Sequence, residues 1–291
     1  MKNLRISIAQ MAPSLLDVRA NLERILRFME EASSGGSDLL VLPEMALTGY
    51  GIEGALEDQG VRARLSRRTR TALSSIRTAS ARLGLDVVVS YPLIFRTRTF
   101  IAAEYVEKGR KNALHRKINL CNYGHYSEHL HFDAGNRPTL ARTRLGHFGL
   151  LVCEDIWHAA NGIVETLSGA EVLLVPAAPC VLSEEAGPAN LEQWETITKA
   201  TAFLQTSYLV LATRVGMEGQ NRFLGGSHVV SPEGRITQRM PLFGEGLLQV
   251  EIDGELLSKI RKKRPLLSNE RASLYAKAFG KIARERAEED L

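Results

Sequence analysis

The sequence predicts an α/β fold in which two β-sheets pack together and helices cover their outer faces. Strand and helix patterns alternate along the 291 residues, and hairpin patterns lie among them. The composition is ordinary for a globular protein, with 44% hydrophobic and 24% charged residues. Because one α/β domain can reach this length, we predict a single domain over residues 1–255 and a helical extension of it over 256–291.

Five strands and two helices are expected in the first part of the chain. Strand patterns, with period-two alternation or runs of β-branched residues, occupy residues 1–8, 39–42, 86–91, 100–107 and 111–117. Proline cannot donate to a strand ladder, so Pro43 and Pro92 are expected to end the strands before them. Apolar residues recur at helical spacing over residues 18–32, behind the N-cap candidate Asp17, and again over 61–83.

The second part repeats this alternation. Apolar or β-rich segments predict strands at residues 149–152, 171–176, 207–213, 227–230, 235–239 and 247–252. Helical patterns occupy residues 161–168, 191–205 and 271–291, the last of them charged and amphipathic. We predict that the chain from Leu256 onward lies at an interface between copies of the protein, with a frayed terminal helix as the alternative.

Cys153 lies where an apolar strand pattern gives way to a pattern compatible with a helix. It follows Leu151 and Val152 and precedes Glu154 and Asp155. A turn of this kind exposes a side chain, and a following helix N-terminus favours the thiolate, which is the nucleophilic form of cysteine. The alternative is a small buried hydrophobic residue, the commonest fate of a free cysteine.

Two further charged residues lie at predicted strand ends. Glu44 follows an apolar run and Pro43, where apolar surroundings would raise the pKa of its carboxyl group and suit it to act as a general base. Lys117 ends the alternating segment 113–117 and would stabilise an oxyanion beside a reactive thiol. An exposed loop acid and an ordinary surface lysine are the respective alternatives.

Together, in this order, these segments resemble the carbon–nitrogen hydrolase (nitrilase) superfamily. The resemblance covers nearly the whole chain and lies in residues 6–10, 43–50, 116–128, 153–157, 225–227 and 231–234. It implies a four-layer α-β-β-α sandwich and association into a homodimer or a larger homo-oligomer. The motifs Asn122-Tyr123-Gly124 and 153–157 look most like the glutaminase domains of glutamine-dependent NAD synthetases, but here without an attached synthetase domain.

The resemblance implies a carbon–nitrogen hydrolase, an amidase that needs no cofactor. Glu44 would be the base, Lys117 the oxyanion donor and Cys153 the nucleophile, which forms a thioester and releases ammonia and a carboxylic acid. Glu128 matches a second acid of the family that positions substrate and Lys117. Further substrate-binding candidates are Tyr50, Tyr123, Tyr126, Glu154 and Ala178.

The substrate is predicted less sharply than the chemistry. The family's glutaminase domains carry a serine before a proline that binds the glutamine amino group, whereas this chain has Ala178 before Pro179. A small carboxamide other than glutamine is therefore favoured, and a glutaminase subunit that passes ammonia to a partner is the alternative. An N-carbamoyl amidohydrolase, a nitrilase and a catalytically silent binding module are less favoured.

Bulk properties exclude several other classes of protein. A formal net charge of +4 is small for this length and argues against a nucleic-acid binder. No apolar run reaches the length of a membrane span, and the N-terminus lacks the apolar core of a signal peptide. Three cysteines form no disulfide framework, which favours a reducing cytoplasm. No metal is expected at His125, His129 and His131, because the resemblance places them on a loop and the mechanism needs none.

Overall fold

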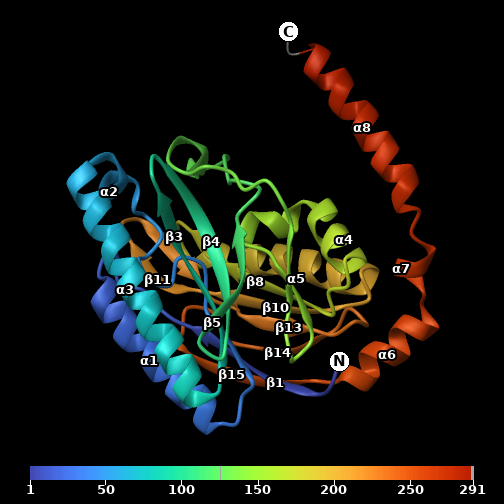
Figure 1. The fold of residues 1–291 in the computed structure, drawn as a ribbon, viewed down its shortest axis with the longest axis horizontal. Coiled ribbons are helices and arrows are strands. Elements are labelled where there is room, and N and C mark those ends of the chain that lie inside the picture. Colours follow the sequence, from blue (N-terminus) through green and yellow to red (C-terminus); the bar gives the residue numbers. More distant parts are fainter. Residues whose placement is uncertain (125, 290–291) are drawn as a thin grey trace.

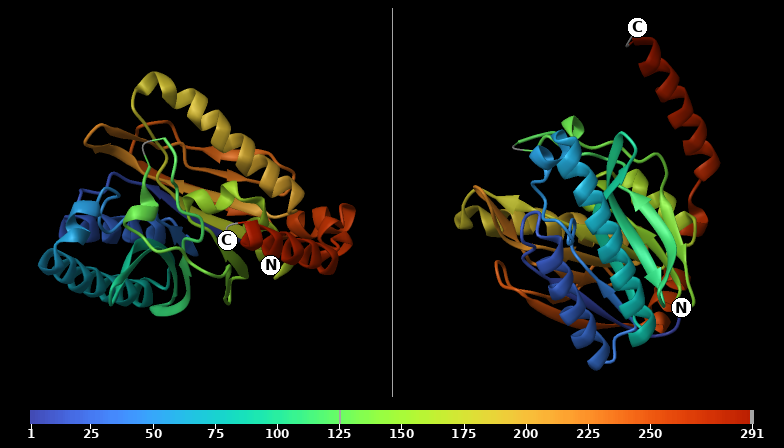
Figure 2. Two further views of the ribbon diagram at one scale, coloured as in Figure 1. Left: turned by 90° about the horizontal axis from the view of Figure 1, so that it is seen from above. Right: turned by 60° about the vertical axis from the view of Figure 1, so that its left-hand side comes forward.

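The computed structural model describes residues 1–124 and 126–289, and in this part of the chain two six-stranded sheets lie face to face (Figures 1 and 2). The first sheet has the order β15 (Gly246–Ile252), β1 (Leu4–Gln10), β2 (Leu39–Val41), β3 (Asp86–Phe95), β4 (Arg98–Glu107) and β5 (Arg110–Arg116). The second has the order β14 (Ile236–Arg239), β13 (His228–Val230), β10 (Tyr208–Thr213), β8 (Val172–Ala177), β7 (His147–Leu150) and β6 (Thr139–Arg142).

Helices cover the outer face of each sheet. α1 (Val18–Ser34) and α3 (Gln59–Leu83) lie on the first sheet, and α4 (Ala159–Leu167) and α5 (Gly187–Leu204) lie on the second (Figure 2). The predicted four-layer α-β-β-α sandwich is therefore confirmed. A smaller sheet joins β11 (Val215–Glu218), β12 (Asn221–Leu224) and β9 (Cys180–Val181).

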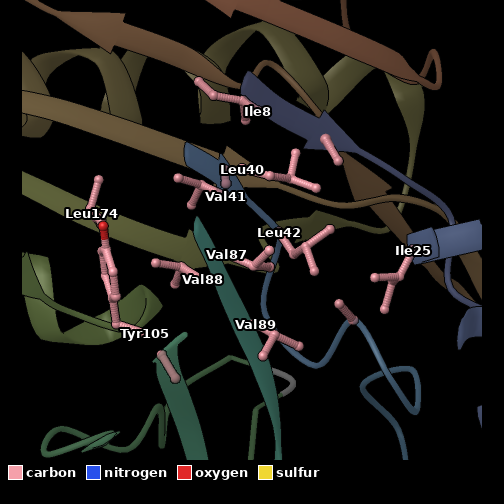
Figure 3. Packing of buried hydrophobic residues seen from close by; sticks show 14 of the residues in the cluster. Ile8, Ile25, Leu40, Val41, Leu42, Val87, Val88, Val89, Tyr105 and Leu174 are labelled. Atoms are coloured by element: carbon pink, nitrogen blue, oxygen red, sulfur yellow. The ribbon is translucent and has the colours of Figure 1, made fainter. Parts of the chain in front are cut away.

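The core lies between the two large sheets. In each sheet three neighbouring strands are parallel, β1, β2 and β3 in one and β10, β8 and β7 in the other. Because such strands are buried on both faces, they read as continuous apolar runs. Alternate residues of β8 point to opposite faces of the sheet: Val172 and Leu174 pack with the first sheet, and Leu173 and Val175 pack beneath α5. Figure 3 shows Leu174 and the valines of β3 among the buried residues of this core.

The expected strand end before Pro43 is confirmed, because β2 ends at Val41, but the one expected at Pro92 is wrong. β3 continues past Pro92 to Phe95, and β8 ends at Ala177, one residue after Pro176. Both prolines lie where the neighbouring parallel strand has already ended: β2 pairs β3 only as far as Val88, and β7 pairs β8 only as far as Leu174. A missing N–H costs little on a side with no partner.

The C-terminal part of the chain leaves the sandwich as three helices. α6 (Gly254–Lys263) buries Leu257 and Ile260 against the sandwich, and α7 (Leu266–Asn269) and α8 (Ala272–Glu289) follow. α8 extends away from the rest of the molecule (Figure 1). The predicted terminal helix is confirmed as far as residue 289, and its last two residues lie outside the described part. Among the described helices, none is both long enough and apolar enough to cross a bilayer.

Candidate active site

The three chemically distinctive residues follow strand ends at one end of the sandwich. Glu44 comes three residues after β2, Lys117 directly after β5, and Cys153 three residues after β7. Cys153 itself has a φ angle of 47°, and Met45, next to Glu44, has 55°. Residues other than glycine seldom adopt this left-handed conformation, which is concentrated at functional sites. Two sharp turns therefore aim Glu44 and Cys153 at the space beyond the strands.

Lys117 is buried between two carboxylates. Its Nζ lies 3.0 Å from Glu44 Oε1 and 2.7 Å from Glu128 Oε1, and the side chains of all three residues are at most 2% exposed. The surface-lysine alternative is thereby excluded. The two carboxylates hold the ammonium group in one position, because no water is available in this buried site to replace either contact.

The environment shifts the pKa values of this pair. Burial raises the pKa of the Glu44 carboxyl group to about 7, although the charge of Lys117 acts in the opposite direction. For Lys117, burial favours the neutral amine, but the carboxylates of Glu44 and Glu128 outweigh it and hold the pKa well above its usual value. Lys117 is therefore a permanent cation, and Glu44 changes its protonation near neutral pH.

Cys153 is half-buried, and its thiol is protonated at rest. Burial and the charge of Glu44 raise the pKa of the thiol well above its usual value, although Lys117 and the backbone N–H of Ala178 lower it. The expected thiolate-favouring helix is wrong, because Cys153 begins a 3₁₀ turn (Cys153–Trp157) and α4 starts only at Ala159. The thiol therefore needs a base. Glu44 Oε2 is buried with no hydrogen-bond partner among the described residues, and can take a proton.

Asp155 joins the lysine segment to the cysteine turn. Its Oδ1 accepts the backbone N–H groups of Ile118 and Asn119 at 2.9 and 2.8 Å. Its Oδ2 accepts the N–H of Val152 at 3.0 Å and lies 2.8 Å from His115 Nε2. One fully buried carboxylate therefore fixes the backbone beside both Lys117 and Cys153.

A cavity of about 220 Å³ opens onto Cys153. Its lining residues are Tyr50, Cys121, Tyr123, Gly124, Tyr126, Glu128, Cys153, Glu154, Trp157, Pro179, Cys180, Asn190, Gln193 and Trp194. The structure thus brings all three predicted tyrosines, Glu128 and Glu154 to one cavity, where the Tyr123 hydroxyl donates to Glu154 at 2.9 Å. A larger hollow of about 710 Å³ beside β5 and β6 contains none of these residues.

Ala178 differs from the other predicted binding residues. It is buried and does not line the cavity, but its backbone N–H reaches the Cys153 sulfur. Two acids later in the same segment, Glu184 and Glu185, do not line the cavity either, and Glu184 pairs with Arg222 at 2.7 Å. The structure therefore brings the backbone of Ala178, rather than its side chain, to Cys153.

Helix α5 supplies residues that sequence reasoning missed. Asn190, Gln193 and Trp194 close the cavity on the side away from the first sheet, and Asn190 Oδ1 is buried with no hydrogen-bond partner in the described part of the chain. The sequence predicted a helix from Leu191 but gave no sign of which face meets the site. An unpartnered amide oxygen in a cavity wall is a candidate acceptor for a substrate donor.

A model of the carbon-nitrogen hydrolase family matches residues 5–262. The chain belongs to this family. As predicted, it is an enzyme that acts on carbon–nitrogen bonds. The hydrolase described as lying in the pqqF 5′ region of Pseudomonas protegens is 31% identical and aligns over 94% of this chain and 92% of its own length.

Two further likenesses place this carbon–nitrogen hydrolase among its relatives. The glutamine-dependent NAD(+) synthetase of Thermotoga maritima is 28% identical over 87% of this chain, which spans only 42% of that protein. An amidase from Nesterenkonia sp. AN1 is 27% identical, with a TM-score of 0.78 and coverage of 94% of this chain and 96% of the other. That structure shows covalent addition of the acetamide moiety of fluoroacetamide at the active-site cysteine.

The histidine-rich loop of the hydrolase gives no sign of a metal centre in the residues that the structure describes. Within them, no group of three His, Cys, Asp or Glu side chains is arranged to hold a metal ion. His129 contacts the side chain of Asn122, with 2.7 Å between Nδ1 and Oδ1. His131 is half-buried, and His125 lies outside the described residues.

Proposed function

We propose that this hydrolase cleaves a small carboxamide through a thioester on Cys153, releasing ammonia and a carboxylic acid. The observation that carries the proposal is the buried Lys117 cation, held by Glu44 and Glu128 beside the half-buried thiol. This arrangement supplies a base, a nucleophile and a fixed positive charge around one cavity.

In the first half of the reaction, ionised Glu44 takes the thiol proton while the Cys153 sulfur attacks the amide carbon. The carbonyl oxygen becomes an oxyanion, which the Lys117 ammonium group and a backbone N–H near Cys153 stabilise. The protonated Glu44 then gives its proton to the amide nitrogen as the carbon–nitrogen bond breaks. Ammonia leaves, and the acyl group remains on the sulfur.

In the second half, water replaces ammonia. Glu44, again ionised, takes a proton from the water as its oxygen attacks the thioester carbon, and the same cation stabilises the second oxyanion. The carbon–sulfur bond breaks, the sulfur regains its proton from Glu44, and the carboxylic acid leaves. Glu128 orients Lys117 throughout, while Tyr50, Tyr123, Tyr126 and Glu154 shape the cavity around the acyl group.

The size and charge of the cavity favour a small amide without a carboxylate. About 220 Å³ lies below the range of drug-sized ligand pockets. The described lining residues include the carboxylates of Glu128 and Glu154 and no Lys, Arg or His. The α-carboxylate of glutamine would meet no cation among them, and Ala178 has no hydroxyl for its amino group.

The alternative is a glutaminase that supplies ammonia to a partner. It is favoured by the likeness to the NAD(+) synthetases, of which the chain matches less than half. Ammonia release from glutamine that rises only when a partner protein is present would distinguish this function from a free amidase.

A substrate panel tests the proposal directly. We expect kcat/KM for uncharged amides such as propionamide and butyramide to exceed that for glutamine by about ten- to a hundredfold. That ratio corresponds to one missing charge-assisted hydrogen bond of roughly 1.5–3 kcal/mol. Ammonia release is measured across glutamine, ω-amides, aliphatic and aromatic amides and N-carbamoyl compounds. Glutamine as the best substrate by a wide margin would restore the glutaminase function.

The activity should depend on pH through Glu44. Because burial raises the pKa of this base to about 7, we expect kcat/KM to fall about tenfold per pH unit below that value. The fall follows from the sign of the shift, since protonated Glu44 cannot accept the thiol proton. Initial rates between pH 5 and 9 measure the profile, with Glu44→Gln as the inactive control. An acid limb at the ordinary carboxyl pKa, near pH 4.5, would show that another group is the base.

We also propose that the C-terminal extension lies between two copies of the hydrolase. One side of α8 carries the exposed apolar residues Leu274, Tyr275, Phe279 and Ile282. Exposed apolar side chains on α4 and α5, Val164, Leu167, Phe203 and Leu204, offer a matching surface. Apolar surface of this kind marks a contact site.

Sedimentation measures the predicted association. The intact protein is expected to behave as a dimer or a larger oligomer, and Phe279→Ser with Ile282→Ser is expected to lower the mass, because these side chains lose their apolar cover. Val164→Ser with Leu167→Ser tests the receiving surface. An intact protein that sediments as a monomer at micromolar concentration would disprove the interface.

A further inference from the structure

Arg214 and Glu218 form a buried ion pair behind the active site. Arg214 follows β10, and its Nη1 lies 2.6 Å from Glu218 Oε1, with side chains only 0% and 5% exposed. The guanidinium carbon lies 3.7 Å from the centre of the Phe223 ring, and Nη2 donates to the carbonyl of Pro13 at 3.3 Å. A guanidinium group fixed by an anion, a ring and a carbonyl is rigid.

The Glu218 carboxylate holds the loop that follows Glu44. The backbone N–H of Tyr50 lies 3.1 Å from both carboxylate oxygens, and that of Gly51 donates to Oε2 at 2.9 Å. Gly49 allows this close approach, because a Cβ there would lie 2.6 Å from Glu218 Oε1 and its φ angle is +77°. The loop backbone is therefore fixed by a residue 168 positions away in the chain.

Tyr50 transmits this position to the buried charges. Its hydroxyl donates to Glu128 Oε1 at 2.5 Å, the same oxygen that accepts Lys117 Nζ at 2.7 Å. Glu128 Oε2 accepts the N–H of Cys121 at 2.8 Å, so the carboxylate is held on both oxygens. A shift of the Tyr50 ring would release one of the contacts that orient Glu128 and, through it, Lys117.

We infer that Arg214 and Glu218 are positioning residues for catalysis: they hold Tyr50 against Glu128 and thereby align Lys117 with Glu44 and Cys153. Stability alone does not account for the pair, because a buried ion pair replaced by uncharged groups of similar volume is often no less stable. The inference rests on the proposed roles of Glu44, Lys117 and Cys153, and it adds two residues that do not contact the cavity.

The test measures the rate at which iodoacetamide alkylates Cys153, followed by intact mass, because this readout needs no known substrate. Three variants are compared: Arg214→Met with Glu218→Gln, Tyr50→Phe, and all three changes together. We expect the charge-pair variant and Tyr50→Phe each to slow alkylation at pH 7 about tenfold. The combined variant should be slower than Tyr50→Phe by less than twofold, because the pair acts through that hydroxyl. Slowing that multiplies to about a hundredfold, or a charge-pair variant as fast as the wild type, would overturn the inference.

A matched control exists on the outer face of the first sheet. Arg77 pairs with the buried Glu104 at 2.6 Å, and the Tyr91 hydroxyl donates to the same carboxylate at 2.9 Å. Arg77→Met with Glu104→Gln is expected to shift the thermal midpoint without changing the alkylation rate. Slowing of alkylation equal to that of the Arg214 and Glu218 variant would show a merely structural effect and would also overturn the inference.

Glu218→Asp provides a second test if the variant with Arg214→Met and Glu218→Gln does not fold. It retains the charge beside Arg214 but withdraws the carboxylate from the Tyr50 N–H, so we expect alkylation to be several-fold slower than in the wild type. Adding Glu218→Asp to Tyr50→Phe should slow alkylation no further. An unchanged rate would contradict the inference. Amide turnover separates the two proposals: a wild type that hydrolyses no amide yet shows this coupling refutes the function alone, and normal turnover by the Arg214 and Glu218 variant refutes the inference alone.

Discussion

Replacing Cys153 by alanine is expected to abolish amide hydrolysis while the fold is retained. The change removes the only atom proposed to form the acyl-enzyme, so the loss in kcat should be roughly 10⁴-fold or more, as for other nucleophiles that act within a triad. The alanine is smaller than cysteine and lies beside an open cavity, so the free energy of unfolding should change little. Ammonia release measures activity, and circular dichroism with thermal unfolding measures the fold.

The other two cysteines provide internal controls, because all three line the same cavity. Burial raises the pKa of Cys121 to about 12 and also raises that of Cys180, so both thiols are protonated at rest, and no base is proposed to act on either. We expect Cys121→Ala and Cys180→Ala to remain active. Preferential modification of Cys121 or Cys180 by iodoacetamide, together with an active Cys153→Ala variant, would show that the nucleophile is assigned wrongly.

Much of the fold was predictable because the central strands are buried on both faces. Runs such as Leu39–Val41 and Val172–Ala177 carry a strong apolar signal, and helices α1 and α3 carry a clear helical period. The short strands of the small third sheet escaped, because β9 has only two residues and β12 begins with Asn221 and Arg222. The strand end expected at Pro92 was misplaced, because a strand tolerates proline where its neighbouring strand has stopped, and that depends on tertiary structure.

The site divides in the same way. Glu44, Lys117 and Cys153 each follow a strand pattern, so it was predictable that the three side chains would lie close together at one end of the sheets. The burial of Lys117 and the protonated state of the Cys153 thiol depend on contacts between segments far apart in the chain. Asn190 and the Arg214–Glu218 pair carry no local signal at all, because their partners are chosen by packing rather than by spacing.

Replacing Lys117 by methionine is expected to remove activity and to lower the free energy of unfolding by about 3–5 kcal/mol, the usual cost of breaking a buried ion pair. Methionine fills similar space, so the cost comes mainly from charge: Glu44 and Glu128 would face each other, almost fully buried, with no cation between them. The oxyanion would also lose its fixed positive charge.

The pH dependence of this loss distinguishes charge from packing. Burial already raises the pKa of Glu44, and Lys117 opposes that rise, so the variant should have a still higher pKa there. The folded variant then binds more protons than the unfolded chain between pH 4.5 and above 7, and its stability falls as pH rises through this window. Urea unfolding at pH 5.5 and pH 8 should therefore show a larger loss of stability at pH 8.

Lys117→Met with Glu128→Gln is the matched control, since removing one carboxylate should restore part of the stability at pH 8 but none of the turnover. An equal loss at both pH values would mean that Lys117 contributes through packing, and measurable turnover by either variant would exclude it as the oxyanion donor.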